Sequence, residues 1–182
     1  IADAFDDMGM RCVQVGGVND FSQSPELVEE MYLKLNKKYP LQSYVLGFHA
    51  EYTCQKGLLE QIAAFSHKYK APVFTHLAET ESEVAGCVER YGMTPVAFLD
   101  SIGMFDYGGG GYHCVHVTEE DIEIMKKRGM FAVTNPSSNL KLASGVAPVS
   151  NFLENGVKVA IGTDGPASNN CLDMFREMFL VT

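Results

Sequence analysis

The sequence reads VFTHLAE from Val73 to Glu79, an apolar run that ends in ionisable side chains. Two later segments have the same form, GYHCVH from Gly111 to His116 and VAIGTDGPASNN from Val159 to Asn170. A buried strand that ends in a His or an Asp is how a barrel enzyme holds reactive groups over the C-terminal mouth of its sheet. The three segments therefore predict parallel strands and, where those strands end, the site of a metal-dependent hydrolase.

Six stretches have the composition of strands, because each is short, bounded by Gly, Pro or Asn, and rich in Val, Ile, Phe or Tyr. They are Arg11–Val15, Tyr44–Phe48, Pro72–His76, Gly111–Val115, Phe131–Thr134 and Val157–Gly162. Helical patterns lie between them, at Pro25–Lys38, Lys56–Tyr69, Glu81–Tyr91, Pro95–Ile102 and Glu119–Arg128. Such alternation predicts an α/β fold in which helices cover a parallel sheet.

The residues between these elements give further expectations. Thr118 is the expected N-cap of the helix at Glu119–Arg128, and Gly129 is expected to be left-handed after it. The run Gly108–Gly111 is interpreted as a loop that leads into a strand. Cys171–Thr182 is interpreted as an amphipathic helix that stops without a cap.

Composition narrows the class of protein. The chain has 182 residues, 46% of them apolar, which is enough for one domain with a sizeable core. Its net charge is −9 and its Lys and Arg residues are scattered, so no basic stripe is present to bind nucleic acid. No apolar run reaches the ~20 residues of a membrane-spanning helix, and the N-terminal residues lack the pattern of a signal peptide. The expected location is the cytoplasm.

Five cysteines occur without a C-x-x-C pair, which argues against a disulfide framework and against a zinc knuckle. We expect reduced thiols in or near the core. Cys114 lies between two histidines, but its interpretation as a small buried apolar residue is preferred to that of a metal ligand.

Three strand ends carry groups that can act on water. His76 ends an apolar strand and Glu79 follows it, so one group can hold an ion while the other takes a proton. Asp164 in GTDG can do both, although TDGPAS is also good turn chemistry. The reactive role is favoured because His76, Asp164 and one of His113 or His116 fall at C-terminal strand ends, which a barrel brings together.

The other polar candidates have two interpretations each. In extended or turning chain, His113 and His116 should point to opposite sides, so that one faces the mouth and the other is structural. His49 either contacts a substrate or is a satisfied loop residue, whereas His67 is interpreted as a solvated surface residue. The segment Thr134–Val149 either lines a ligand pocket with amides and hydroxyls or is a capped connection.

Four ordered motifs resemble those of the amidohydrolase superfamily, namely HLAETESEV, GGGGYHCVH, NPSSNLKLASGVAPV and GTDGPASNNCLDMFREM. Within it the chain is most similar to the cytosine-deaminase-like aminohydrolases and to the 5-methylthioadenosine/S-adenosylhomocysteine deaminase family, from about Met10 onward. The resemblance implies a TIM (β/α)8 barrel with one divalent metal ion, usually zinc, although iron, nickel or manganese would suit the same ligands. It also implies hydrolytic deamination of a purine nucleoside or related amino-heterocycle, in which metal-bound hydroxide attacks and ammonia leaves.

The resemblance also assigns roles to residues. His76 and Asp164 would bind the metal. Glu79 would shuttle a proton between water and the ring nitrogen, and Asp164 would also accept the water's proton. His113 would steady the attacking hydroxide, and the substrate would meet His49, Glu79 and Asp164. His116 matches a family position without assigned chemistry.

Two departures limit what the resemblance implies. The family takes two further metal ligands from an H-x-H motif on its first strand, and this sequence has none. His76 and Asp164 are two ligands, where a catalytic zinc site has three from the protein. The family also has arginines near its third strand, whereas the stretch Val13–Glu26 has none, so the family's named substrate does not follow.

Both ends of the chain also look cut, because Ile1–Met8 has the pattern of the last turns of a helix. The expectation is a partial barrel domain over residues 1–182 that holds strands 3 to 8, without the first strands or the flanking β domain. Such a chain is expected to be inactive by itself. The expected partners are a small-molecule substrate and further copies of the chain in a homo-oligomer. The alternatives are a non-catalytic fragment that is stable only by association, and an amidohydrolase that dechlorinates or cleaves amides.

Overall fold

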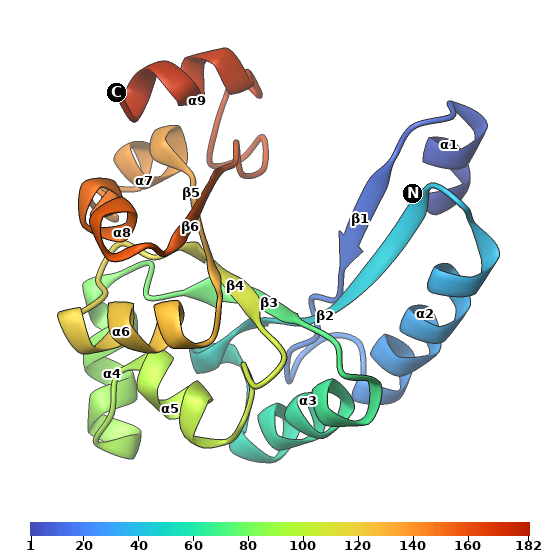
Figure 1. Cartoon of the computed structure of the whole chain (residues 1–182), viewed down its shortest axis with the longest axis horizontal. Coiled ribbons are helices and arrows are strands. Elements are labelled where there is room, and N and C mark those ends of the chain that lie inside the picture. Colours follow the sequence, from blue (N-terminus) through green and yellow to red (C-terminus); the bar gives the residue numbers. More distant parts are fainter.

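Six strands form one parallel sheet in chain order, and the computed structural model describes residues 1–182. The strands are β1 (Cys12–Val15), β2 (Gln42–Ala50), β3 (Val73–Leu77), β4 (Gly109–His113), β5 (Phe131–Thr134) and β6 (Lys158–Ile161). The sheet curves, with helices along its outer side (Figure 1). β1 pairs only with β2 and β6 only with β5, so the sheet is an open, partial barrel. The predicted α/β fold with six βα units is confirmed.

Helices connect the strands on the outer side. They are α1 (Ala2–Asp7), α2 (Pro25–Lys38), the 3-10 turn η1 (Glu51–Thr53), α3 (Lys56–Tyr69), α4 (Glu81–Tyr91), α5 (Pro95–Ser101), α6 (Glu119–Lys127), α7 (Pro136–Lys141), α8 (Val149–Asn155) and α9 (Met174–Leu180). Thr118 caps α6, where its hydroxyl accepts from Asp121 N and the Asp121 carboxylate accepts from Thr118 N. Gly129 has a φ of 63°, as expected for the residue after this helix.

The start of β4 was misplaced by the sequence analysis. Gly109–Gly111 belong to the strand and are not a loop. A Cβ on Gly109 would lie 1.9 Å from the carbonyl oxygen of Val73, so the neighbouring strand leaves no space for a side chain there. The strand ends at His113 because His113 and Cys114 have φ values of 72° and 49°, in the left-handed region.

Other differences concern the lengths of elements. β2 extends to Ala50, so His49 lies within a strand and does not follow one. α9 begins at Met174, where the Asp173 carboxylate accepts from the first N–H groups, and not at Cys171. The polar segment at Thr134–Val149 contains the short helix α7, which periodicity did not reveal.

The core lies between the sheet and the outer helices. Alternate residues of β3 face it, so Val73 and Leu77 are completely buried and belong to the same apolar cluster as Leu59 and Ile62 of α3. Cys54, Cys87 and Cys114 are buried free thiols as expected, but Cys171 is exposed and not part of the core. None of the helices has the length and apolar character that crossing a membrane requires.

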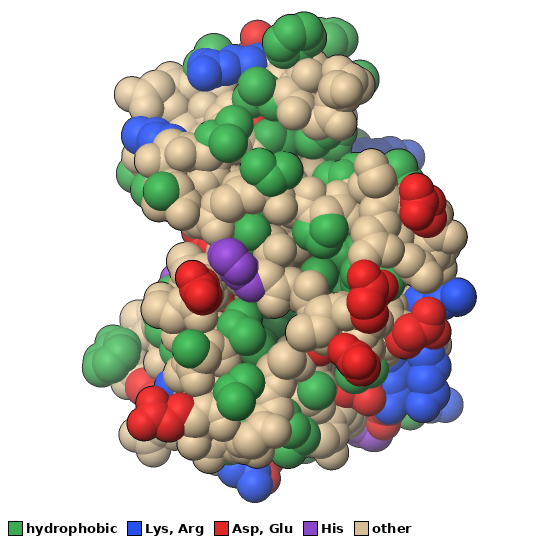
Figure 2. All heavy atoms as spheres, turned by 90° about the vertical axis from the view of Figure 1, so that its left-hand side faces the viewer, with side chains coloured by type: hydrophobic (Ala, Val, Ile, Leu, Met, Phe, Trp, Pro, Cys, Tyr) green, Lys and Arg blue, Asp and Glu red, His purple; other side chains and the backbone are tan.

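Large apolar side chains are exposed near the two edges of the sheet. Val13 on β1 is 65% exposed, and Phe175 and Phe179 on α9 are 82% and 78% exposed. Figure 2 shows the face at the left of Figure 1, where apolar side chains are spread from top to bottom and a hollow lies at one margin beside a histidine and an acidic side chain.

Candidate active site

A cavity of about 260 Å³ opens at the C-terminal ends of the strands. Its lining residues are His76, Tyr112, His113, Val133, Asn135, Gly162 and Asp164. Strand register explains part of this set, because His76 pairs with Tyr112 and Tyr112 pairs with Val133. The three side chains therefore lie side by side on the inner face of the sheet, opposite the core. The structure brings the predicted groups of β3, β4 and β6 to one cavity.

His76 is held by one ring nitrogen. Its Nδ1 lies 2.6 Å from the backbone carbonyl oxygen of His49. A carbonyl can only accept, so Nδ1 carries the proton and Nε2 keeps its lone pair. A backbone carbonyl that holds one nitrogen of an imidazole is the usual outer partner of a metal-binding histidine.

His113 is 2% exposed and has two polar neighbours. Its Nδ1 donates to Asn139 Oδ1 at 2.8 Å, and Nδ1 also lies 3.4 Å from Asn135 Nδ2. One nitrogen cannot donate and accept at once, and the shorter contact determines the tautomer. Nε2 is then the nitrogen that faces Glu79 Oε2, at 3.6 Å.

Glu79 follows a tight turn that several hydrogen bonds hold. Ala78 has a φ of 49°, and its N–H and that of Glu79 both donate to the Glu83 carboxylate at 2.8 Å. The carbonyl of Ala78 accepts from Val115 N and His116 N. The side chain of Glu79 accepts from Ser144 Oγ at 3.3 Å.

The Glu83 carboxylate is almost completely buried. Burial raises its pKa, and the hydrogen bonds from backbone N–H groups oppose that rise. Its position on the first turn of α4 places two acceptor oxygens directly under the turn that carries Glu79.

Asp164 is also on a left-handed residue, with a φ of 59°. Its Oδ2 accepts from Ser138 Oγ at 2.6 Å and from Ser168 Oγ at 2.7 Å, and its Oδ1 accepts from Gly165 N at 2.6 Å. Burial by itself would raise the pKa of Asp164, but these three hydrogen bonds outweigh it and the pKa is lowered. Asp164 is thus held as a carboxylate on the cavity wall. Of its two predicted roles, in a turn and at the site, the structure shows the turn, and it also places Asp164 in the lining of the cavity.

His49 is half-buried beside His76, with ring centroids 4.9 Å apart. Its Nδ1 lies 3.0 Å from Thr53 Oγ1, whose own proton goes to the carbonyl of Ala50. His49 Nδ1 is therefore the donor and Nε2 the free acceptor. Burial, followed by repulsion from His76, lowers the pKa of His49.

His49 does not line the cavity, and neither do the two remaining histidines, His116 and His67. His116 is tied through Nε2 to the carbonyl of Ser144 at 2.7 Å. As predicted, His113 and His116 point in different directions: His113 lines the cavity and His116 does not, and the chain turns between them, where His113 and Cys114 have φ values of 72° and 49°. His67 is exposed, as expected, and its Nε2 lies 3.2 Å from Asp106 Oδ2.

The donor set for a metal ion is incomplete in this chain. No group of three or more His, Cys, Asp or Glu side chains is arranged to hold an ion. His76 and Asp164 have suitable chemistry, a lone pair on an imidazole with a carbonyl behind it and a hydrogen-bonded carboxylate, and both line one cavity. They fit as two ligands of a site that needs at least one more.

The sequence analysis missed the polar residues that hold the candidate groups. They are Glu83, Asn139, Ser138, Ser144 and Ser168. The sequence indicated them only by the high density of small polar residues in NPSSNLKLAS and GPASNN. That density does not predict which hydroxyl group donates to which carboxylate.

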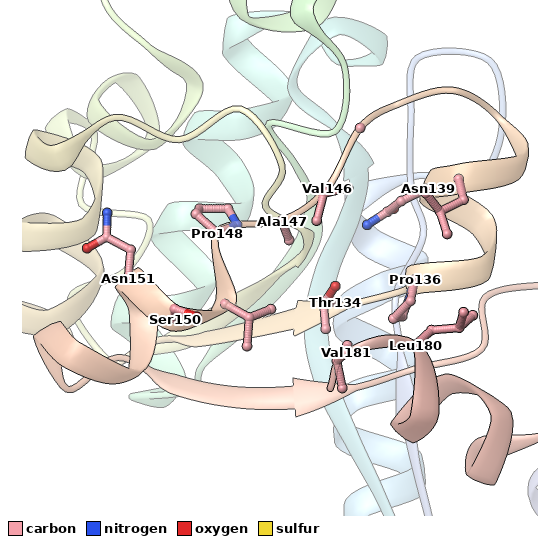
Figure 3. Close-up of a pocket in the computed structure, with 13 residues that line it drawn as sticks. Thr134, Pro136, Asn139, Val146, Ala147, Pro148, Ser150, Asn151, Leu180 and Val181 are labelled. Atoms are coloured by element: carbon pink, nitrogen blue, oxygen red, sulfur yellow. The ribbon is translucent and has the colours of Figure 1, made fainter.

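A larger cavity of about 400 Å³ lies between β5, α7, α8 and α9 (Figure 3). In Figure 3, Thr134, Pro136, Leu180 and Val181 line one side of it, and Val146, Ala147 and Pro148 lie on the other. It contains none of the predicted reactive residues. Chemistry and not size therefore identifies the smaller cavity as the candidate site.

Comparisons with known proteins identify the family of the chain. The amidohydrolase family pattern matches residues 1–182. The chain is 49% identical over 137 residues to a 5-methylthioadenosine/S-adenosylhomocysteine deaminase of Dictyoglomus thermophilum, covering 75% of this chain and 32% of that protein. It is 40% identical over 184 residues to a 5'-deoxyadenosine deaminase of Methanopyrus kandleri, covering 98% of this chain and 43% of that protein.

Among solved structures, an adenosine deaminase from Xanthomonas campestris with bound zinc matches with a TM-score of 0.89 and 34% identity. That match covers 97% of this chain and 42% of the other. The chain therefore spans less than half the length of these proteins.

Proposed function

The chain belongs to the amidohydrolase family, and on that premise we propose that it carries part of the active site of a metal-dependent hydrolytic deaminase. The reaction would replace the exocyclic amine of a purine nucleoside or related amino-heterocycle by oxygen and release ammonia. The proposal concerns the protein to which these residues contribute, because the chain spans 43% of the length of a deaminase that it matches.

One observation carries the proposal. A carboxylate and an imidazole, Glu79 Oε2 and His113 Nε2, lie 3.6 Å apart beside the cavity that His76 and Asp164 also line. Hydrolysis at a ring carbon needs a group that moves protons and a group that holds developing charge on oxygen. This arrangement provides both.

His76 and Asp164 would hold the metal ion, with the remaining ligands supplied by residues outside this chain. A divalent ion bound there would lower the pKa of a water molecule toward ~7 and so supply a nucleophile at neutral pH. Zinc is the favoured ion because imidazole and carboxylate suit it and because a matched adenosine deaminase contains it.

The side chains of this chain would divide the remaining work. Glu79 would take a proton from the attacking water and return it to the ring nitrogen, and Ser144 Oγ would hold the carboxylate at Oε1 meanwhile. His113, with Nδ1 committed to Asn139, would hold the attacking oxygen through Nε2. His49 would accept a hydrogen bond from the substrate at Nε2.

The substrate is proposed as an amino-purine nucleoside. Relatives at 40% and 49% identity are named for deamination of 5'-deoxyadenosine and of 5-methylthioadenosine or S-adenosylhomocysteine. These substrates share the adenine ring and differ at the 5' position, so they define a panel in which the ring is constant.

The test is ammonia release from this panel by the protein, measured with zinc present and after treatment with a chelator. Adenosine and 5'-deoxyadenosine are expected to release ammonia, chelation to stop the reaction, and added zinc to restore it. Guanine and a chlorinated triazine serve as comparison substrates. Activity confined to the triazine, with chloride and not ammonia released, would replace deamination by dechlorination.

A binding measurement tests the metal proposal apart from turnover. Calorimetric titration with zinc is expected to give weaker binding to His76→Ala and Asp164→Ala than to the parent, because each removes a ligand. His116→Ala is the matched control, since His116 is bound to a backbone carbonyl away from the cavity. Equal affinity for all four proteins would contradict the assignment.

A further inference from the structure

The segment that follows β5 is unusually rich in buried polar residues. We call Asn135–Ser144, which includes α7, the α7 segment. Its buried polar residues are Asn135, Ser137, Ser138, Asn139 and Ser144, all at most 8% exposed. Buried polar groups are almost always hydrogen-bonded. The partners of these groups therefore indicate what the segment does.

Three of the partners are the proposed reactive side chains, from three different strand ends. The hydrogen bonds are Ser138 Oγ to Asp164 Oδ2 at 2.6 Å, His113 Nδ1 to Asn139 Oδ1 at 2.8 Å, and Ser144 Oγ to Glu79 Oε1 at 3.3 Å. One short segment thus contacts groups that β3, β4 and β6 position separately. A displacement of this segment would alter all three at once.

The α7 segment is in turn held by α9. No side chain of its own caps α7. Instead, Ser137 N donates to Glu177 Oε2 at 2.9 Å, and Asn169 Nδ2 donates to Glu177 Oε1 at 2.8 Å. Asn169 also donates to the carbonyl of Thr163, the residue before Asp164. The Glu177 carboxylate is completely buried and joins the first turn of α7 to the turn that carries Asp164.

We propose that Glu177 is a positioning residue, which acts through the α7 segment to hold His113 and Asp164 in their reactive orientation. The proposal rests on the proposed function in so far as these two side chains are the reacting ones. Glu177 itself touches neither of them, and its two oxygens accept only from Ser137 N and Asn169 Nδ2.

The substitution Glu177→Gln tests this role with almost no change in volume. The amide keeps one acceptor oxygen and turns an NH₂ group toward a buried donor, either Ser137 N or Asn169 Nδ2. A buried donor that loses its acceptor is unfavourable, so the first turn of α7 should shift or loosen. Asn139 and Ser138 lie on that helix and would move with it.

The chain offers a matched control next to the affected position. The hydroxyl of Ser137 is buried but has no hydrogen-bond partner. Ser137→Ala therefore removes a hydroxyl from the same helical turn and keeps the N–H that Glu177 binds. We expect this variant to behave as the parent does.

The first readout is the Nδ1–H proton of His113 in the metal-free protein, observed by NMR and assigned by its loss in His113→Gln. Its exchange with solvent is compared with that of the Leu59 amide, which lies in the core. Global unfolding speeds both exchanges equally, whereas local loosening speeds only the His113 proton. We expect Glu177→Gln to raise the His113 rate alone, by at least about 10-fold, and Ser137→Ala to leave it unchanged.

The second readout is turnover of the zinc-loaded protein below the unfolding temperature of each variant. Glu177→Gln is expected to lower kcat by about 10- to 100-fold with KM little changed, because the reacting groups are misplaced while the cavity remains. Should Glu177→Gln fail to fold, Glu177→Asp keeps the carboxyl group with a shorter reach and provides the same comparison.

The outcomes separate this proposal from the proposed function. Parental His113 exchange and parental kcat in a folded Glu177 variant would overturn the positioning role. A parent without ammonia release, but with selective loosening of His113 in Glu177→Gln, would overturn the deaminase proposal and leave the coupling of Glu177 to His113 in place.

Discussion

Glu79 shows how single residues determine this site. Its carboxylate is held by Ser144 on one side and lies 3.6 Å from His113 on the other, while the backbone turn under it is bound by Glu83. These contacts leave little freedom for the side chain. In the proposed reaction, this position would let Glu79 move a proton between the attacking water and the ring nitrogen.

Substitution of Glu79 by Gln should remove the proton transfer and preserve the shape of the site. We expect turnover to fall by at least ~100-fold, the usual contribution of a positioned general acid-base. Steady-state kinetics with 5'-deoxyadenosine would measure it. Glu81→Gln, at the exposed first residue of α4, is the control and should retain the parental rate; a near-normal rate in Glu79→Gln would remove Glu79 from the mechanism.

The cysteines make a second prediction about single residues. Burial raises the pKa of Cys54 to about 11 and that of Cys87 to about 12, whereas Cys171 is exposed. Because the thiolate is the reactive form, a disulfide reagent at pH 8 should modify Cys171 first and leave the two buried thiols intact until the protein unfolds. Cys171→Ser should lose this fast phase, and rapid modification of Cys54 or Cys87 in the native state would contradict the burial.

The elements of the sheet place these residues through register and through one run of glycines. β4 begins with Gly109–Gly111 because β3 and β5 approach it closely on both sides. The same strand ends in left-handed backbone at His113, which brings an imidazole to the cavity. The position of β4 therefore depends on glycine at its beginning and on an unusual turn at its end.

Gly109→Ala should be strongly destabilising. The added Cβ would meet the Val73 carbonyl at 1.9 Å, and the φ of 136° is unfavourable for any side chain. We expect the free energy of unfolding to fall by at least about 3 kcal/mol, measured by urea denaturation. Gly57→Ala in α3 is the control, since nothing lies within 4 Å of the added carbon; it should stabilise the protein by up to about 1 kcal/mol. Similar midpoints for both variants would contradict the close approach of β3 and β4.

At the scale of the whole molecule, the buried thiols predict how the free energy of unfolding depends on pH. The folded-state pKa values of Cys54 and Cys87 lie above the unfolded value of 9.0. Above pH 9 the unfolded chain ionises these thiols and the folded chain does not, so stability present below pH 9 should be lost as the pH rises toward 11 and 12. Urea denaturation at a series of pH values should show a smaller loss of unfolding free energy above pH 9 in Cys87→Ala than in the parent. If the unfolding free energy of the variant falls with pH as steeply as that of the parent, the Cys87 thiol is not the cause of the loss.

The open sheet predicts association of the 182-residue chain. β1 and β6 each have one unpaired edge, and Phe175 and Phe179 expose most of their surface. Unpaired edges and exposed aromatic side chains favour contacts between chains. Sedimentation at micromolar concentration should show dimers or larger species, and Phe175→Ser with Phe179→Ser should shift them toward monomer. A parent that sediments as a monomer would contradict this prediction.

The sequence by itself determined the alternation of strands and helices, the cap of α6 and the strand ends that carry His76, His113 and Asp164, because alternation, capping and apolar runs are local properties of the chain. The absence of an H-x-H motif, compared with the family that the chain resembles, gives the expectation that further metal ligands come from outside these residues. The errors of prediction also have local causes. The predicted start of β4 was too late because glycines stand where strands usually have apolar residues, and α7 was not predicted because it is too short to show a helical period.

Only the tertiary structure decided how these groups are held. Asn139 meets His113, Ser138 meets Asp164, and Ser144 meets Glu79 across 26 to 65 residues of chain. A hydroxyl or an amide in a polar segment has many possible partners, and the packing of β5 and α7 against neighbouring strand ends selects one of them. The burial of Glu177 depends on that packing too, since its hydrogen bonds to Ser137 and Asn169 form only when α9 covers α7.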